Sequence, residues 1–491
     1  MNKDTASLAR KEKGENRLQE LLDHLGRLLP DAAQRRAFEA CSRTPPPPSL
    51  RLNPLIAGSQ SLSESLSKRA QPVPWCSEGY VFPADENRLS YTIEHAIGAY
   101  YLQAKAPMFA VETLAPQPGE RVLDLCAAPG GKTTQLAAHM NNSGLLVANE
   151  MSKKRLPALV GNLERCGVSN AVITQAQGTL LARYFHNFFD RILVDAPCSG
   201  DGIVRKDLSM LRYWSPEDAQ RQAQTQTGLL RAAFHMLRPG GSLVYSTCSL
   251  SLEENEHVLM ALLTRYSESA SVLPISSIET SPLAESIRTG LPDSLRHAVR
   301  IWPHLYDTEG AFVACLGKQS STQWPRVESD AAQWLCSAAD DPSAVEACQT
   351  FERLWYFSIP RTADQVVASR GRHLIMQPAA SDSIENNLPF FVRAGMRFGR
   401  RHKTHCYFTQ QAVSLWGHRA IERCVDLNWD SVCALFRGER LALEKPLAQR
   451  GEVICRHGIW PICRAMIEEE GTQLNGMLPR PFYRNEVQRL T

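Results

Sequence analysis

The sequence predicts an α/β fold in which a largely parallel sheet carries helices on both faces. Between residues 121 and 248, short apolar runs alternate with helix-prone stretches of roughly 10–15 residues, the pattern of repeated β–α units. Chemically distinctive residues follow several of these runs, and in such a sheet the carboxyl ends of the strands gather at one edge. The expected parallel strands are residues 121–125, 145–148, 171–174, 190–195 and 242–247, and an antiparallel pair is expected at 299–301 and 311–316.

A small α+β N-terminal extension, residues 1–95, is expected to precede the sheet. Four prolines at positions 45–48 indicate a rigid linker within it. The other expected elements are a helical stretch with leucines on one face (18–40, interrupted at Pro30), an extended segment (49–54), a strand with its turn (73–81) and a helix-rich stretch (91–114).

Two helices between the core strands are indicated by their ends. Ser152 is a candidate cap for a helix that runs to Cys166, although Pro157 lies inside that stretch. A longer helix is expected over residues 217–237, where Pro239 and the glycines after it stop the pattern.

The composition changes after the predicted core domain, residues 96–318. The polar residues 319–322 indicate a linker. A small intermediate domain is expected at 325–395. Short apolar runs separated by turns then predict a β-rich module at 396–491.

Composition excludes several classes of protein. The 491 residues are too many for one domain, and 43% hydrophobic with 21% charged residues is typical of globular proteins. No signal peptide and no apolar run of about 18 residues is seen, so we expect no membrane partner. None of the 14 cysteines forms a C-x-x-C pair, so no metal site is predicted and reduced thiols in a cytoplasmic protein are expected.

The glycine-rich stretch at residues 122–133 reads Val-Leu-Asp-Leu-Cys-Ala-Ala-Pro-Gly-Gly-Lys-Thr. It predicts a buried strand, a tight turn and a helix that begins beneath a ligand. A P-loop requires glycine where Cys126 stands, and the dinucleotide pattern G-x-G-x-x-G is absent. The alternative is an ordinary strand-to-helix turn with no ligand.

Glu150 ends the next predicted strand, 26 residues after Asp124. An acid at this place can accept both hydroxyls of a ribose, although a solvated surface acid is the plain alternative. The turn and the acid together predict a nucleoside ligand with a charged tail. S-adenosylmethionine meets that description.

Two of the cysteines, Cys198 and Cys248, follow apolar strands and lie in loops of small, polar residues. Most cysteines are small buried hydrophobes. A loop cysteine at a ligand-facing strand end can instead be a thiolate, which is a strong nucleophile. Position alone leaves the two interpretations of this pair equally open.

Three motifs, at residues 124–133, 195–200 and 246–249, resemble the signatures of the NOL1/NOP2/Sun family of S-adenosylmethionine-dependent RNA cytosine-5 methyltransferases. Within that family the chain is most similar to the bacterial 16S rRNA enzymes of the F type. The resemblance implies a Rossmann-like methyltransferase core and a C-terminal PUA-like RNA-binding domain. Further matching segments are Arg51-Leu52-Asn53, Arg205-Lys206-Asp207, Trp214-Ser215-Pro216, Arg238-Pro239-Gly240-Gly241, Glu253-Glu254-Asn255-Glu256 and Tyr306-Asp307-Thr308-Glu309-Gly310.

The resemblance also implies roles for individual residues. Cys248 is the nucleophile that adds to carbon 6 of cytosine, Asp195 binds the ring near nitrogen 3 and borders the methyl group, and Cys198 assists removal of the proton on carbon 5. Glu150 binds the ribose of S-adenosylmethionine. The methionine part is bound by Cys126, Ala127, Ala128, Pro129, Gly130, Gly131 and Lys132.

Two positions depart from the family pattern. Gln177 stands where an acid normally binds the adenine amino group, and its amide oxygen can still accept a hydrogen bond, so weaker cofactor binding is expected. Residues 103–108 read Gln-Ala-Lys-Ala-Pro-Met where the family usually has Gln, an acid and Ser-Ser-Met. A change in substrate choice or efficiency is the expected consequence.

RNA contacts are expected in two regions. Arg205 and Lys206 follow the Cys198 loop and are candidates for contact near the target nucleotide. Residues 393–403 carry five cations and no acid, among them Arg400, Arg401 and Lys403, so they predict contact with an RNA backbone. A solvated surface loop is the alternative.

Taken together, these features predict a monomeric RNA cytosine-5 methyltransferase that acts on 16S rRNA or the 30S subunit. Two alternatives stay open at this point. One is a tRNA methyltransferase, because the same motifs serve both substrates. The other is a non-catalytic RNA-binding ribosome assembly factor, which the departures at Gln177 and 104–107 would suit and the retained cysteines would not.

Overall fold

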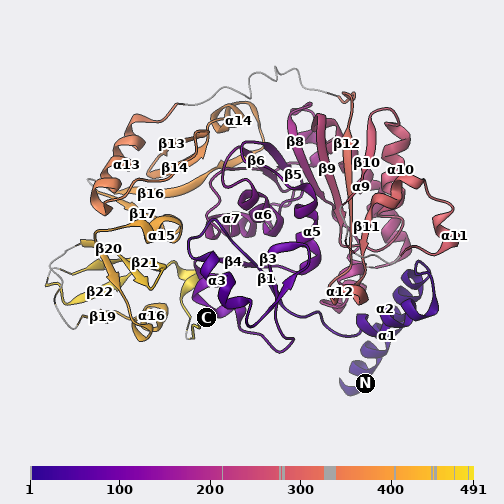
Figure 1. Ribbon diagram of the computed structural model, residues 1–491, viewed down its shortest axis with the longest axis horizontal. Helices are drawn as coiled ribbons and strands as arrows, with labels where there is room; N and C mark the ends of the chain where they lie inside the picture. Colours follow the sequence, from indigo (N-terminus) through magenta and orange to yellow (C-terminus); the bar gives the residue numbers. More distant parts are fainter. Residues whose placement is uncertain are drawn as a thin grey trace.

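The computed structural model describes residues 3–212, 214–275, 278, 282–325, 339–402, 405–443, 446, 451–468, 470–484 and 486–490. A large sheet with helices on both faces forms its centre. The N-terminal helices and the C-terminal β-rich region lie on opposite sides of that centre (Figure 1). Among the described residues, no helix combines the length and the apolarity needed to cross a bilayer.

The central sheet has a parallel core in the strand order β9-β8-β5-β6-β7. These strands are β5 (Arg121–Asp124), β6 (Leu145–Asn149), β7 (Ala171–Thr174), β8 (Phe189–Asp195) and β9 (Leu237–Thr247). Antiparallel strands extend it on both sides: β12 (Ala311–Lys318), β11 (Val299–Ile301) and β10 (Ala270–Leu273) beyond β9, and β15 (Phe391–Ala394) beyond β7. The predicted α/β class is confirmed, while β10 and β15 were not foreseen.

Successive residues of each core strand enter different apolar clusters because side chains alternate across a sheet. Val122 and Leu146 pack on one face, and Leu123 and Val147 pack on the other. The first face is covered by α5 (Lys105–Leu114), α6 (Gly131–His139) and α7 (Leu156–Arg165). The second is covered by α8 (Gly178–Leu181), α9 (Pro216–Met236) and α10 (Glu256–Arg265).

The strand order places the ligand-binding edge. The chain builds the sheet outward from β5 through β6 and β7, then returns to the other side of β5 with β8. In open α/β sheets, ligands bind outside the carboxyl ends of the strands at this reversal. The loops after β5, β6, β8 and β9 therefore surround one crevice.

The expected cap at Ser152 is not formed. Helix α7 begins at Leu156 with Arg155 before it, and Pro157 lies in its first turn, where a missing N–H does no harm. The backbone N of Ser152 instead donates to Glu150 Oε1 over 2.7 Å. In α9, by contrast, Ser215 caps the helix by accepting from the backbone N of Asp218.

The N-terminal region packs on the ligand-binding loops. The leucines of α1 (Lys3–Gly26) join one apolar cluster with Val204, Leu211 and Leu250, which lie after β8 and β9. The other elements here are α2 (Ala32–Ser42), α3 (Ser59–Leu66), η1 (Leu89–Tyr91), α4 (Ile93–Ala96) and the antiparallel sheet β2 (Gln71–Val73), β3 (Cys76–Val81), β1 (Ser49–Leu52), β4 (Tyr100–Leu102).

The C-terminal region holds two further sheets. One contains β13 (Gln365–Arg370), β14 (His373–Pro378), β16 (Met396–His402) and β17 (His405–Phe408). The other contains β18 (Cys424–Asp426), β20 (Gly451–His457), β21 (Trp460–Ile467), β22 (Gln473–Gly476) and β19 (Leu441–Ala442). Helices α13 (Pro342–Trp355), α14 (Ser381–Asn387), α15 (Gln410–Trp416) and α16 (Trp429–Phe436) accompany them.

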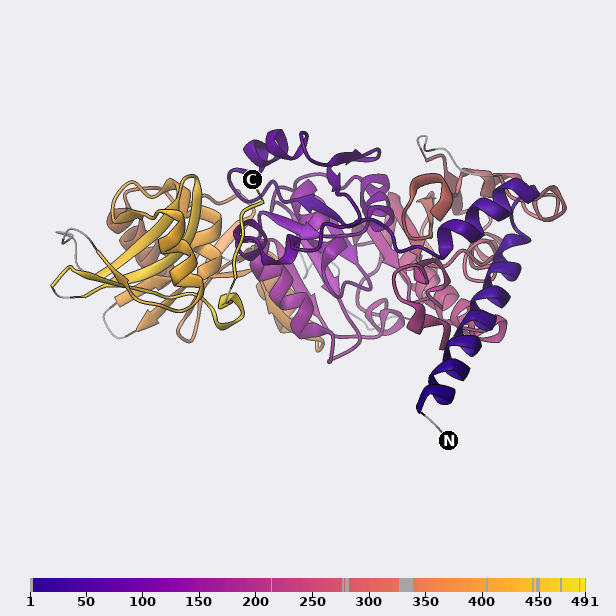
Figure 2. The ribbon, with the colours of Figure 1, turned by 90° about the horizontal axis from the view of Figure 1, so that it is seen from below.

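The end of the chain returns to the N-terminal sheet (Figure 2). Gln488 forms a bridge with Thr92, and Arg484 Nη1 donates to the carbonyl of Ser90 over 2.5 Å. One apolar cluster joins residues of β1 and β4 to residues of α13 and β20. The boundaries predicted at 95/96, 318, 325 and 395/396 stay predictions.

Candidate active site

The turn between β5 and α6 forms the floor of the site. Asp124 ends β5, and its buried carboxylate accepts from Thr133 Oγ1 over 2.7 Å. Burial raises the pKa of Asp124 to about 7 and raises the pKa of the Cys126 thiol as well. Gly130 caps α6 with φ +108°, and a Cβ there would lie 3.3 Å from the side chain of Leu159, so glycine lets the turn close.

A cavity of 540 Å³ opens above this turn, at the carboxyl ends of β5, β6 and β8. This volume lies within the range of small-molecule sites. It is lined by Leu125, Cys126, Ala128, Asn149, Glu150, Met151, Arg155, Ala176, Gln177, Gly178, Thr179, Asp195, Ala196, Pro197, Cys198, Gly200, Met210, Gln224, Thr225, Gly228, Leu229 and Cys248. We call it the cofactor cavity.

Two polar side chains of this cavity fit a nucleoside. Glu150 is only 4% exposed, yet Oε2 has no hydrogen-bond partner among the described residues, although Arg155 Nη1 lies 3.2 Å away. A buried carboxylate oxygen of this kind suits a ribose hydroxyl. Gln177 is exposed at the start of α8, and its side chain makes no capping bond. It is therefore free to meet an adenine edge.

A second cavity, of 300 Å³, meets the first at Asp195 and Cys248. We call it the base cavity. It is lined by Ala104, Ala106, Pro107, Ala110, Lys132, Asp195, Ile203, Lys206, Asp207, Ser246, Thr247, Cys248, Glu309, Gly310, Ala311 and Val313. The unusual segment 103–108 thus supplies part of its wall.

Asp195 lies where the two cavities meet. Oδ2 accepts from Lys132 Nζ over 2.6 Å, and Oδ1 accepts from Ser246 Oγ over 2.9 Å. Lys132 lines the base cavity and not the cofactor cavity. The predicted contact of Lys132 with the methionine part stays a prediction, and the geometry favours a role toward the base.

The two loop cysteines are neighbours. The backbone N of Cys248, which follows β9, donates to Sγ of Cys198, which follows β8, over 3.3 Å. Both thiols line the cofactor cavity, and Cys248 also lines the base cavity. The hydrogen bond to Cys248 and then burial raise the pKa of Cys198 well above its usual range. Cys198 therefore carries a proton at neutral pH.

Two buried carboxylates fix the cysteine loops. Glu254 accepts from the backbone N and the Oγ of Ser199 and from Gln226 Nε2, at 2.9, 2.5 and 2.8 Å. Asp201 accepts from Ser249 Oγ over 2.8 Å and from the backbone N of Leu250 over 2.6 Å. Burial raises the pKa of Asp201 to about 6. Sequence reasoning assigned neither residue a role.

Comparison with known proteins decides the family. The family model described as 16S rRNA methyltransferase RsmB/F matches residues 111–317, and that of the N-terminal domain of 16S rRNA methyltransferase RsmF matches residues 19–105. Ribosomal RNA small subunit methyltransferase F of Vibrio cholerae is 32% identical over 469 residues, which cover 94% of this chain and 96% of the relative. The chain belongs to the RsmB/F methyltransferase family.

Other relatives agree. Ribosomal RNA small subunit methyltransferase F of Klebsiella pneumoniae is 33% identical over 91% of this chain and 92% of its own. A methyltransferase homologue from Pyrococcus horikoshii has a solved structure with a TM-score of 0.53 and 30% identity, covering 63% of this chain and 99% of that one. A structure titled NSun6 from the same organism with SFG has a TM-score of 0.53 at 23% identity, covering 62% and 98%. The chain is therefore an RNA methyltransferase.

In this enzyme the two cations after the Cys198 loop lie in different surroundings. Lys206 lines the base cavity, its side chain is 62% exposed, and Nζ lies 3.6 Å from Glu309. Arg205 is buried, and its guanidinium donates to the carbonyls of Thr44 and Thr308 and pairs with Asp307. RNA contact by Lys206 fits this geometry, whereas the geometry of Arg205 favours a structural role.

The predicted basic run lies on β15 and β16. Arg400 is exposed, and Arg401 Nη2 donates to the carbonyl of Ser343. Arg393 pairs with Glu164 of α7 at 2.5 Å and so joins the run to the core. Lys403 lies outside the described residues. Contact of this region with RNA stays a prediction.

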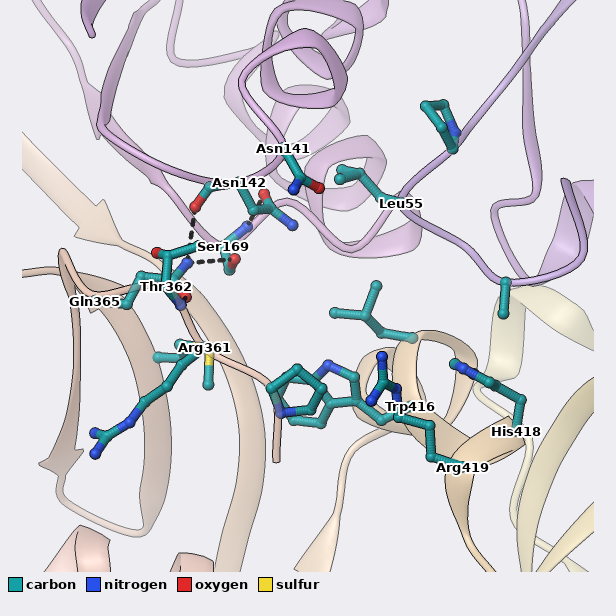
Figure 3. A pocket seen from close by; sticks show the side chains of 15 residues that line it. Leu55, Asn141, Asn142, Ser169, Arg361, Thr362, Gln365, Trp416, His418 and Arg419 are labelled. Atoms are coloured by element: carbon teal, nitrogen blue, oxygen red, sulfur yellow. Dashed lines mark hydrogen bonds between the residues drawn. The ribbon is translucent and has the colours of Figure 1, made fainter. Parts of the chain in front are cut away.

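Two further features lie outside the site. Within the described residues, Cys76, Glu78 and Glu112 form a group that could hold a metal, but they line neither cavity, and Glu112 Oε1 already accepts from Gln135 and His139. A 390 Å³ cavity between the core and the C-terminal region, with Asn142 on one side and Trp416 on the other, shares no residue with either cavity (Figure 3).

Proposed function

We propose that the protein transfers a methyl group from S-adenosylmethionine to carbon 5 of one cytidine in 16S rRNA, through a covalent bond to Cys248. The observation that carries this proposal is the position of Cys248, which lines both cavities beside Asp195. A nucleophile at that boundary can reach a base in one cavity while the methyl donor occupies the other.

The donor set of the cofactor cavity fits S-adenosylmethionine. Glu150 would hold the ribose, Gln177 the adenine amino group and the turn at 126–131 the methionine part. The sulfonium supplies a methyl group bound to a good leaving group. A relative with the same fold carries the ligand named SFG in its title, and the RsmF name of several relatives supports 16S rRNA as substrate.

Carbon 5 of cytosine becomes nucleophilic only after addition at carbon 6. The Cys248 sulfur forms a bond to carbon 6, and the electron pair of the carbon 5–carbon 6 double bond moves into the ring toward nitrogen 3. Asp195 and Lys132 face that side of the base cavity and stabilise the developing charge. Carbon 5 then takes the methyl group.

Removal of the carbon 5 proton restores the aromatic ring and breaks the Cys248–carbon 6 bond. Cys198 is held beside Cys248 by the 3.3 Å hydrogen bond. That bond is the largest cause of its raised pKa. Once the Cys248 sulfur is bonded to carbon 6, this cause weakens, so Cys198 more readily gives up its own proton and accepts the one from carbon 5.

Bisulfite sequencing tests the proposal. Total RNA from cells with and without the gene is compared, and one protected cytidine in 16S rRNA is expected to lose protection in the deletion strain. Restoring the gene should restore it, and restoring Cys248→Ala should not. Protection lost only in tRNA would redirect the substrate assignment, and no change in any RNA would refute the proposal.

A further inference from the structure

A third cavity, of 420 Å³, continues from the base cavity. It shares Ala104, Lys206 and Glu309 with the base cavity, so the two form one path. Its lining is Pro45, Pro46, Pro47, Pro48, Ser49, Ala84, Glu86, Asn87, Leu89, Ser90, Leu102, Gln103, Ala104, Lys206 and Glu309. We call it the flanking cavity.

The run of four prolines forms one wall of the flanking cavity. Proline rings present apolar faces and no N–H, so they suit the face of a planar base. Both ends of the run are fixed: Thr44 accepts from Arg205 Nε over 2.9 Å, and Ser49 Oγ donates to the carbonyl of Gln103 over 2.7 Å. The wall is therefore preorganised and loses little freedom on binding.

The opposite wall carries hydrogen-bond acceptors. Glu86 Oε1 accepts from the backbone N of Arg88 over 3.1 Å, and in the described part of the chain Oε2 has no partner. The Asn87 side chain is exposed and likewise lacks a partner among those residues. Glu309 also lines the cavity and is 5% exposed. Two carboxylates disfavour a phosphate here and favour a ligand that donates hydrogen bonds.

We propose that the flanking cavity holds the base of the nucleotide next to the target cytidine, and that Glu86 selects a base with an exocyclic amino group over uracil. Adenine, cytosine and guanine each carry such an amino group, whereas uracil presents carbonyl oxygens that a carboxylate repels. Lys206, which lines both cavities, is the cation nearest the phosphate that joins the two nucleotides. This inference rests on the proposed function.

The experiment uses RNA fragments centred on the cytidine that bisulfite sequencing identifies. At the position before and the position after the target, the base is adenine, cytosine, guanine, uracil or removed altogether. The full-length enzyme is compared with Glu86→Gln and with the control Asp85→Asn. Asp85 loses the same charge one residue away and does not line the cavity. Thermal melts show that each variant is folded.

At one of the two positions, we expect removal of the base to lower kcat/KM by about ten-fold or more, since base stacking contributes roughly 1–3 kcal/mol. Uracil there should lower it about five-fold. Glu86→Gln should abolish that discrimination, because an amide can donate to a uracil carbonyl, and Asp85→Asn should keep it. Equal rates for all bases at both positions, or discrimination that survives in Glu86→Gln, would overturn the inference. The proposed function would still stand, since it fails only if the target cytidine is not methylated.

Discussion

The backbone N of Cys248 donates a hydrogen bond to the Cys198 sulfur across 3.3 Å. This contact joins the loop after β9 to the loop after β8 at the boundary of the cofactor and base cavities. It also distinguishes the two thiols. Cys198 is the acceptor and keeps its proton, whereas the Cys248 sulfur lines both cavities and is the one in reach of the base.

The first prediction concerns these two thiols. Cys198→Ala should accumulate a covalent protein–RNA adduct, because the carbon 5 proton has no acceptor and elimination stalls. Cys248→Ala should form none. The measurement is a denaturing gel of enzyme incubated with labelled RNA and S-adenosylmethionine. An adduct in Cys248→Ala would reverse the two roles.

Asp201 provides the second prediction. Its carboxylate holds Ser249 and Leu250, directly after the nucleophile. In Asp201→Ala the loss of a charge-assisted hydrogen bond of about 1.5–3 kcal/mol should lower kcat about ten- to hundred-fold. Binding of S-adenosylmethionine, measured by calorimetry, should stay unchanged because Asp201 does not line the cofactor cavity. The control Asp430→Asn, exposed on α16, should keep full activity. Unchanged kcat in Asp201→Ala would contradict this role.

Much of the core could be predicted from the sequence because its signals are local. Each apolar run of the central sheet became a strand, and the reversal between β5 and β8 brings together the loops that contain Glu150, Asp195 and the two cysteines. The strand β15 could not be predicted, since its pairing with β7 joins residues more than 200 positions apart. The same holds for Gln488, which meets Thr92.

The roles of charged residues were the least predictable part of the site. Arg205 and Lys206 are adjacent cations in sequence, yet one side chain is buried against Thr44 and Thr308 and the other faces the base cavity. Only the fold separates them. Glu254 lay within a matching segment, but its three hydrogen bonds to Ser199 and Gln226 depend on side chains from β8's loop and α9.

The third prediction concerns Gln177 on the adenine side of the cofactor cavity. Gln177→Glu should tighten S-adenosylmethionine binding about five-fold, because a carboxylate accepts from the adenine amino group more strongly than an amide does. Calorimetric titration measures the change. Gln175→Glu carries the same charge two residues earlier without lining the cavity and should have no such effect. Weaker binding in Gln177→Glu would contradict the assigned contact.

The fourth prediction is a pH dependence from Asp124, whose pKa burial raises to about 7. Between about pH 4 and pH 7 the folded protein keeps a proton at this carboxyl that the unfolded chain loses, so the free energy of unfolding falls as pH rises. Asp124→Asn stays neutral, and its amide oxygen can still accept from Thr133. Its stability relative to the original protein should therefore grow by about 2–3 kcal/mol from pH 5 to pH 8. Melting curves that stay parallel over this range would show that Asp124 is ionised throughout.

The last prediction separates the adjacent cations by salt dependence. Lys206→Ala should raise KM for RNA and reduce the slope of log affinity against log salt by about 1, because one exposed phosphate contact is lost. Arg205→Ala should instead lower the melting temperature, because it leaves buried carbonyls of Thr44 and Thr308 without a donor. Filter binding at several salt concentrations, together with thermal melts, distinguishes the two outcomes. An unchanged slope in Lys206→Ala would place the phosphate contact elsewhere. A stable Arg205→Ala with a reduced slope would show that Arg205 reaches the RNA after all.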